Sequence, residues 1–89
     1  MNDDLYTLKP HQIVMYAVDW CPDCKRAKFF FKRKGITYEM VNVDEDPRGA
    51  EFVKEVNLGK RSVPTIVFPD GSIMVEPSED QLSEKFSSS

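Results

Sequence analysis

The sequence predicts an α/β fold in which three helices flank a four-stranded mixed sheet. Residues 13–18 form a continuous apolar run, typical of a strand that is buried on both faces. Residues 22–34 then show helical periodicity, and a later strand-like run at 63–68 turns through Pro-Asp-Gly into 72–75. The order is strand, helix, strand, helix, strand, strand, helix. It predicts a parallel pair of strands, an antiparallel hairpin and helices on both faces of the sheet.

Size and composition fit one domain over residues 1–89, with a lead-in at 1–12 and a frayed tail at 87–89. A net charge of −3 argues against nucleic acid as a partner, since phosphate binding needs a basic surface. No apolar run approaches the ~20 residues that span a bilayer. The acidic first residues do not resemble a signal peptide. We therefore expect a cytoplasmic monomer without membrane partners.

The first helix is predicted to begin at Pro22, because a residue without an N–H group is tolerated in the first turn. Cys24, Ala27 and Phe31 follow at spacings of three and four and form one apolar face, while most other positions are basic. Gly35 is a suitable C-terminal cap. This helix is therefore expected to pack its apolar face on the sheet.

The remaining elements are predicted from their boundaries. Residues 36–43 alternate as a second strand. Asp46 is a suitable N-cap and Pro47 a first residue for the second helix, which ends near 57–59. The segment 78–81, Ser-Glu-Asp-Gln, resembles a capping box and starts a short last helix.

Cys21 and Cys24 are the two cysteines of the chain. A bridge between them would be local, so it would not connect distant segments as a structural disulfide does. A C-x-x-C pair near a strand–helix–strand pattern indicates redox chemistry. Cys21 is expected over the unpaired N–H groups of the first helical turn, where a thiolate is favoured, and Cys24 is expected to face inward. We therefore predict that Cys21 attacks a disulfide and that Cys24 resolves the mixed disulfide.

Nearby charges and metal binding qualify this interpretation. The carboxylate of Asp23 opposes a thiolate at Cys21, whereas Lys25 and Arg26 favour it.

A tetrahedral zinc needs four ligands, and His11 is the single histidine that the chain offers beside the cysteines. We therefore expect no metal site in one chain, and keep an iron–sulfur cluster shared by two subunits as the alternative.

Substrate contacts are predicted near Pro64. If the Val63–Pro64 bond is cis, the backbone of Val63 faces outward and can pair with an extended disulfide partner beside Cys21. A trans proline at a strand start is the other interpretation. Arg61 is a candidate ligand for a carboxylate or an acidic partner. Trp20 is either a platform for a partner or a packing residue.

With these residues placed, the sequence resembles the glutaredoxin family, which has a thioredoxin-like fold, over about 13–86. Residues 21–28, C-P-D-C-K-R-A-K, match the family's C-P-x-C-x-R-A-K opening. Residues 61–64 match its R-[ST]-V-P segment, in which the proline is cis and lies against the active site. Within the family the sequence is most similar to the mycoredoxin-like branch of actinobacteria. The stretches that carry this similarity are 56–65, 68–72 and 77–78.

The resemblance implies a thiol–disulfide oxidoreductase that reduces protein disulfides or protein–small-thiol mixed disulfides. It implies no tightly bound cofactor, and regeneration by a low-molecular-weight thiol (mycothiol or glutathione) or by a thioredoxin-reductase-type flavoenzyme. The catalytic residues are then Cys21 and Cys24. The expected substrate-binding residues are Trp20, Pro22, Asp23, Arg61, Val63 and Pro64.

Three positions depart from the pattern of glutathione-using members. Val18 replaces a lysine, Asp23 a tyrosine, and Glu76 lies where a Gly-Gly pair is usual. These changes favour a different small thiol or direct reduction by a flavoenzyme. The alternatives to a general reductase are an iron–sulfur carrier or adaptor, and a dedicated electron donor to ribonucleotide reductase. That donor's usual motif lacks a proline after the first cysteine, whereas this chain has Pro22.

Overall fold

The computed structural model describes residues 4–87, so the predicted start of the lead-in at 1–3 and the end of the tail at 88–89 lie outside the described residues. The predicted order of strands and helices is confirmed. The elements are β1 (Val14–Ala17), α1 (Pro22–Lys34), β2 (Glu39–Asn42), α2 (Pro47–Val56), β3 (Thr65–Val67), β4 (Ile73–Val75) and α3 (Glu79–Ser87).

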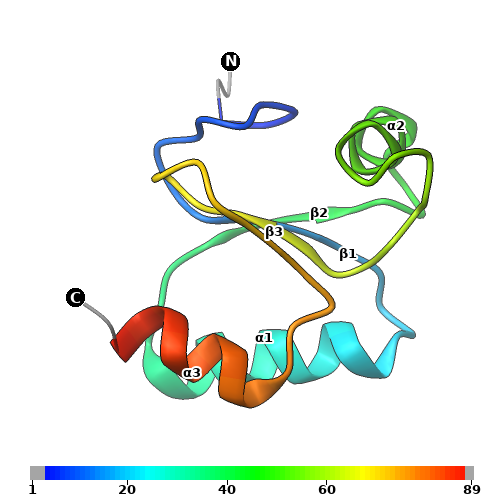
Figure 1. The fold of residues 1–89 in the computed structure, drawn as a ribbon. Coiled ribbons are helices and arrows are strands. Elements are labelled where there is room, and N and C mark those ends of the chain that lie inside the picture. The colour runs from blue at the N-terminus through cyan, green and yellow to red at the C-terminus, as the bar shows by residue number, and fades with distance from the viewer. Residues whose placement is uncertain (1–3, 88–89) are drawn as a thin grey trace.

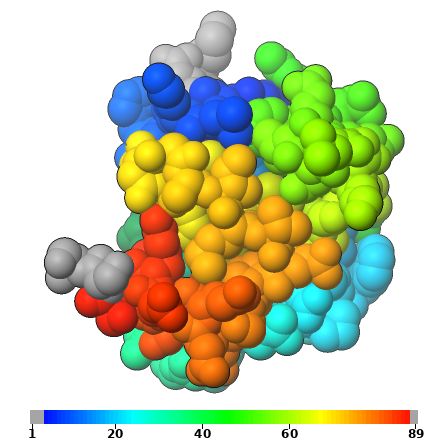
Figure 2. Space-filling model, in the orientation of Figure 1, coloured from blue at the N-terminus to red at the C-terminus, as the bar shows by residue number. Residues whose placement is uncertain are grey.

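The sheet is mixed, with strand order β2-β1-β3-β4. β1 runs parallel to β2 and antiparallel to β3, and β3 and β4 form the antiparallel hairpin. Helix α2 lies on one face of the sheet, and α1 and α3 lie together on the other (Figure 1). On the surface in Figure 2 the hairpin, yellow to orange, lies between the blue N-terminal segment and the red α3.

The core is centred on β1. Residues 14–18 are 0% exposed, because this strand has a neighbour on each side and helices on both faces. Phe31 of α1 packs edge-on against Tyr38 and Phe86, with ring centroids 4.9 and 5.6 Å apart. Full burial of a side chain of this size contributes about 1.5–3 kcal/mol. The continuous apolar run in the sequence is therefore a central strand.

The predicted helix ends are confirmed. Gly35 has a φ of 68° and closes α1, in a conformation that favours glycine. The Asp46 carboxylate accepts a hydrogen bond from the Arg48 N–H at 3.1 Å and caps α2. Ser78 and Gln81 exchange hydrogen bonds of 2.9 and 3.1 Å between side chain and backbone, which completes the capping box of α3. These short-range patterns set where each helix begins or ends.

All four strands are shorter than predicted, and the difference is largest in β2 and β3. The run 36–43 contributes only Glu39–Asn42 to the sheet, and 63–68 contributes only Thr65–Val67. β1 has four residues, so its neighbours can pair with it over no greater length. Pro64 has no N–H to donate, which delays the start of β3. Strand ends therefore depend on partners as well as on local sequence.

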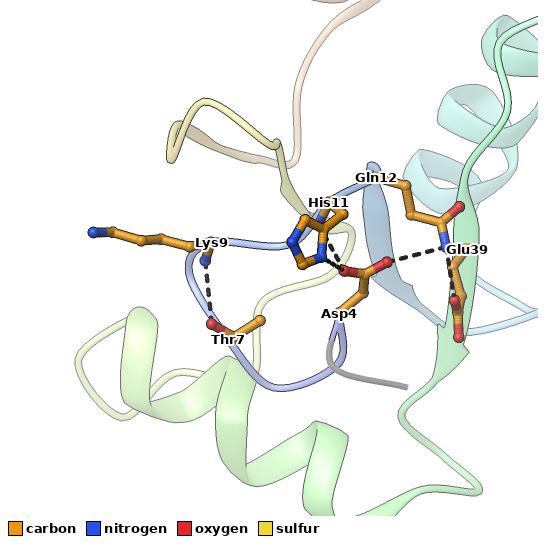
Figure 3. Close-up of polar contacts among 6 residues, drawn as sticks. All are labelled: Asp4, Thr7, Lys9, His11, Gln12 and Glu39. Atoms are coloured by element: carbon orange, nitrogen blue, oxygen red, sulfur yellow. Dashed lines mark hydrogen bonds and ion pairs between the residues drawn. The ribbon is translucent and has the colours of Figure 1, made fainter. Parts of the chain in front are cut away.

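The lead-in is fastened to the sheet by a polar cluster (Figure 3). The Asp4 carboxylate accepts hydrogen bonds from the His11 backbone N–H at 2.6 Å and from Gln12 Nε2 at 3.3 Å. Gln12 Nε2 also donates to Glu39 Oε1 of β2 at 3.1 Å. His11, to which the sequence assigned no role, is thus part of this cluster.

Among the described helices, none is long and apolar enough to cross a membrane.

Candidate active site

The two cysteines lie at the start of α1, directly after the central strand. Cys21 is the N-cap residue, with extended backbone, and Pro22 is the first helical residue, as predicted. The Cys21 side chain is half-buried, whereas Cys24 is 0% exposed and belongs to the core. Both are free thiols. The geometry therefore presents one thiol at the positive end of a helix and holds the other in the interior behind it.

Burial determines the protonation of the inner cysteine. It raises the pKa of Cys24 from 9.0 to about 11, and the neighbouring Cys21 contributes in the same direction. A backbone hydrogen bond with Val18 and the charge of Lys28 partly oppose this increase in pKa. Cys24 is therefore a protonated thiol at neutral pH.

The Val63–Pro64 segment lies against the first cysteine. The Val63–Pro64 bond is cis, in agreement with the family resemblance. The Val63 carbonyl oxygen is 3.9 Å from Cys21 Sγ and accepts a weak hydrogen bond from the thiol. Pro64 is buried, and its carbonyl accepts a hydrogen bond from the Glu76 N–H at 2.9 Å. Val63 thus lies against the Cys21 sulfur, and Glu76 is joined through its backbone to the adjacent Pro64.

The acidic residue inside the cysteine motif is neutralised by its neighbour. Asp23 forms an ion pair with Arg26 at 2.9 Å, one turn further along α1. Arg26 also donates to the carbonyl of Pro77 at 3.3 Å and so connects α1 to the segment before α3. Lys25 is exposed. The negative charge of Asp23 and the positive charges of Lys25 and Arg26 thus lie close together, and Arg26 contacts the Asp23 carboxylate directly.

Trp20 and Arg61 are joined by Asp44, which lies in the turn after β2. The indole of Trp20 is 66% exposed and donates from Nε1 to Asp44 Oδ2 at 2.8 Å. Arg61 Nη2 donates to Asp44 Oδ1 at 2.7 Å and to the Val43 carbonyl at 3.1 Å. Arg61, predicted to receive a carboxylate from a ligand, thus already holds one from the protein.

The location of Asp44 near the cysteine motif could have been expected from its place in the sequence. Carboxyl ends of parallel strands meet at the same edge of a sheet. Asp44 follows β2, and the cysteine motif follows the parallel β1. Arg61 and then Trp20 hydrogen-bond to Asp44 and lower its pKa, so this carboxylate is ionised at neutral pH.

The residues around the cysteines do not form a cluster of metal ligands in the part of the chain that the structure describes. Within residues 4–87, no group of three or more histidine, cysteine or acidic residues is arranged to hold a metal ion. His11, the further ligand considered from the sequence, has its Nδ1 3.1 Å from Asp4 Oδ1 in the lead-in cluster.

Comparisons with known proteins agree with this geometry. The family model described as Glutaredoxin matches residues 13–73. A Mycobacterium tuberculosis protein that is named as a glutaredoxin is 38% identical over 73 residues, which cover 82% of this chain and 87% of that protein. Mycoredoxin 1 of Corynebacterium glutamicum is 38% identical over 65 residues, covering 73% and 80%. A buckwheat glutaredoxin in complex with glutathione superposes with a TM-score of 0.61 at 26% identity, covering 84% and 67%. The predicted thioredoxin-like fold and the similarity to mycoredoxins are both confirmed.

Proposed function

The chain belongs to the glutaredoxin family and is a thiol–disulfide oxidoreductase, and on that premise we propose that Cys21 and Cys24 reduce protein disulfides or protein–small-thiol mixed disulfides. One observation carries the assignment of roles. A half-buried thiol caps α1, and a fully buried thiol lies one turn behind it. The accessible Cys21 is the nucleophile and the enclosed Cys24 is the resolving cysteine.

The reaction proceeds by two thiol–disulfide exchanges. Cys21 attacks as a thiolate and bonds to one sulfur of the substrate, and the other sulfur leaves and takes up a proton. Cys24 then gives up its proton and attacks Cys21 Sγ, which releases the second substrate thiol. Two electrons and two protons pass to the substrate, and the protein is left with a Cys21–Cys24 disulfide. Because its pKa is about 11, Cys24 does not compete for the first attack.

We assign substrate docking to Val63 and Pro64, with Trp20 as a neighbouring surface. The carbonyl of Val63 is 3.9 Å from Cys21 Sγ, which supports pairing between the backbone of an extended substrate and this segment. Trp20 is 66% exposed beside the nucleophile. Pro22 is exposed and Asp23 is half-buried in the same motif, where both are within reach of a docked segment.

A low-molecular-weight thiol or a thioredoxin-reductase-type flavoenzyme regenerates the dithiol in this proposal. The glutathione complex of the buckwheat relative supports a small thiol. Val18 is buried and offers no cation, and Glu76 places an exposed carboxylate next to Pro64. These features favour mycothiol over glutathione. The proposed setting is the cytoplasm, where thiols are kept reduced.

Intact-mass spectrometry of two cysteine variants tests this function. The Cys24→Ser variant is expected to retain a covalent cap on Cys21 when it is mixed with disulfides of small thiols, because the resolving thiol is missing. The Cys21→Ser variant is expected to acquire no cap and to reduce nothing. Full turnover by Cys21→Ser would end the proposal. The thiol that transfers fastest to Cys24→Ser identifies the reductant.

A further inference from the structure

Three cations near the cysteine motif are engaged by carboxylates of the protein itself, whereas Lys25 is exposed and forms no ion pair among residues 4–87. Arg26 pairs with Asp23, and Lys28 Nζ lies 3.5 Å from Asp19 Oδ1. The third pair, Arg61 with Asp44, differs because it bridges two loops that frame Cys21. These three cations are therefore less attractive to a substrate carboxylate than unpaired cations would be, because each already has a carboxylate beside it.

In the third pair, two acceptors bind one nitrogen of Arg61, Nη2. Asp44 Oδ1 accepts from the guanidinium at 2.7 Å, and the Val43 carbonyl accepts from the same nitrogen at 3.1 Å. The other oxygen of Asp44 accepts from Trp20 Nε1 at 2.8 Å, which holds the carboxylate in place. Arg61 lies two residues before Val63, whose carbonyl contacts Cys21 Sγ. The pair thus borders the proposed docking segment.

Both side chains of this pair are 38% exposed, so a bound substrate can reach them. Asp44 already offsets the positive charge of Arg61 and holds its Nη2, so a substrate carboxylate meets a cation that is paired and must compete with Asp44 at that nitrogen. Asp44 is attached to the same chain, and its effective concentration at Arg61 is in the millimolar range or above. A dilute external carboxylate therefore competes poorly for Arg61.

We propose that Asp44 is a specificity-determining residue that occupies Arg61 and makes the enzyme discriminate against disulfides with a carboxylate beside the sulfur. This inference rests on the proposed function and narrows its substrate class to disulfides that are uncharged or cationic at that position. Glu76 acts in the same sense: among residues 4–87 its exposed carboxylate makes no ion pair, and its N–H binds the Pro64 carbonyl.

The Asp44→Asn variant tests the inference with three symmetric disulfides of similar size. These are hydroxyethyl disulfide, which is neutral, dithiodipropionate, which is anionic, and cystamine, which is cationic. Each oxidises the reduced protein to the Cys21–Cys24 disulfide and is released as two thiols. Acid quenching, alkylation and intact mass separate reduced protein from oxidised protein. For each variant, the rate of oxidation by the anionic disulfide is divided by the rate of oxidation by the neutral disulfide. A change in the intrinsic reactivity of Cys21 alters both rates equally and therefore cancels in this ratio.

Asp44→Asn is expected to raise the ratio of anionic to neutral rates by about twofold to fivefold, the range that exposed charge pairs produce. It is expected to lower the ratio of cationic to neutral rates. The double variant Asp44→Asn, Arg61→Gln is expected to return both ratios to the parent values, because the gain requires a free Arg61. Asp44→Ser, which also removes the charge, is expected to behave as Asp44→Asn does.

Glu45→Gln is the matched control, since it removes the same charge from the adjacent exposed position. An equal shift in Glu45→Gln, or a shift that persists in the double variant, would overturn the inference and indicate a general effect of net charge. Unchanged ratios in Asp44→Asn would overturn it as well. Failure of the unmodified protein to react with the neutral disulfide would overturn the proposed function too, so the two failures are distinguishable.

Discussion

The protonation of Cys24 can be tested with the Cys21→Ser variant, in which Cys24 is the sole thiol. Burial of this side chain, 0% exposed, is the largest contribution to a pKa of about 11, against 9.0 for an unperturbed thiol. Two pKa units lower the thiolate fraction at neutral pH by about 100-fold. Removal of Cys21 takes away a smaller contribution of the same sign, so the pKa of Cys24 is expected to remain above 9.0.

The assay is the rate of Cys24 alkylation by iodoacetamide as a function of pH, followed by intact mass. The rate is expected to rise with pH to a midpoint above pH 9, since only the thiolate reacts and burial raises the pKa of Cys24. A cysteine peptide measured in parallel gives the reference midpoint. A midpoint at or below pH 9 in the folded variant would show that burial does not raise the pKa of Cys24, and would refute the division of roles between the two cysteines.

Three further predictions concern stability. In the folded protein the pKa of Cys24 is about 11 and that of Tyr16 about 12, whereas in the unfolded chain they are near 9.0 and 10.0. Above about pH 9 the unfolded chain therefore binds fewer protons than the folded protein, and stability falls as the pH rises. Thermal unfolding scans at several pH values should show this decrease. Gly49→Ala gains about 1 kcal/mol of helix propensity, but its Cβ would lie 2.8 Å from Cγ1 of the stiff Val41 side chain, at a cost of about 1–3 kcal/mol. Urea unfolding is expected to show a net loss of stability, and a gain would contradict the close contact. Phe31→Ala is expected to lower the free energy of unfolding by about 3–5 kcal/mol in the same assay, and a loss below 1 kcal/mol would indicate that the aromatic cluster adds little.

The helix boundaries and the cysteine pair could be predicted from the sequence because they depend on residues close together in the chain. Pro22 starts α1 and Gly35 closes it, as their backbone preferences require. The two-residue spacer places Cys21 before the helix and Cys24 inside it, facing the core. Local chemistry alone therefore determined the order of the elements and the redox motif.

Tertiary structure decided which distant groups surround that motif. Asp44 lies 24 positions from Trp20 and 17 from Arg61, and it meets both because β2 packs parallel to β1 and ends at the same edge of the sheet. The sequence predicted that Arg61 would await a ligand, while the fold supplies it with an internal carboxylate. An ion pair forms only when packing brings two opposite charges within about 4 Å of each other. Which charges come that close depends on the arrangement of the strands, and no local pattern of residues encodes that arrangement.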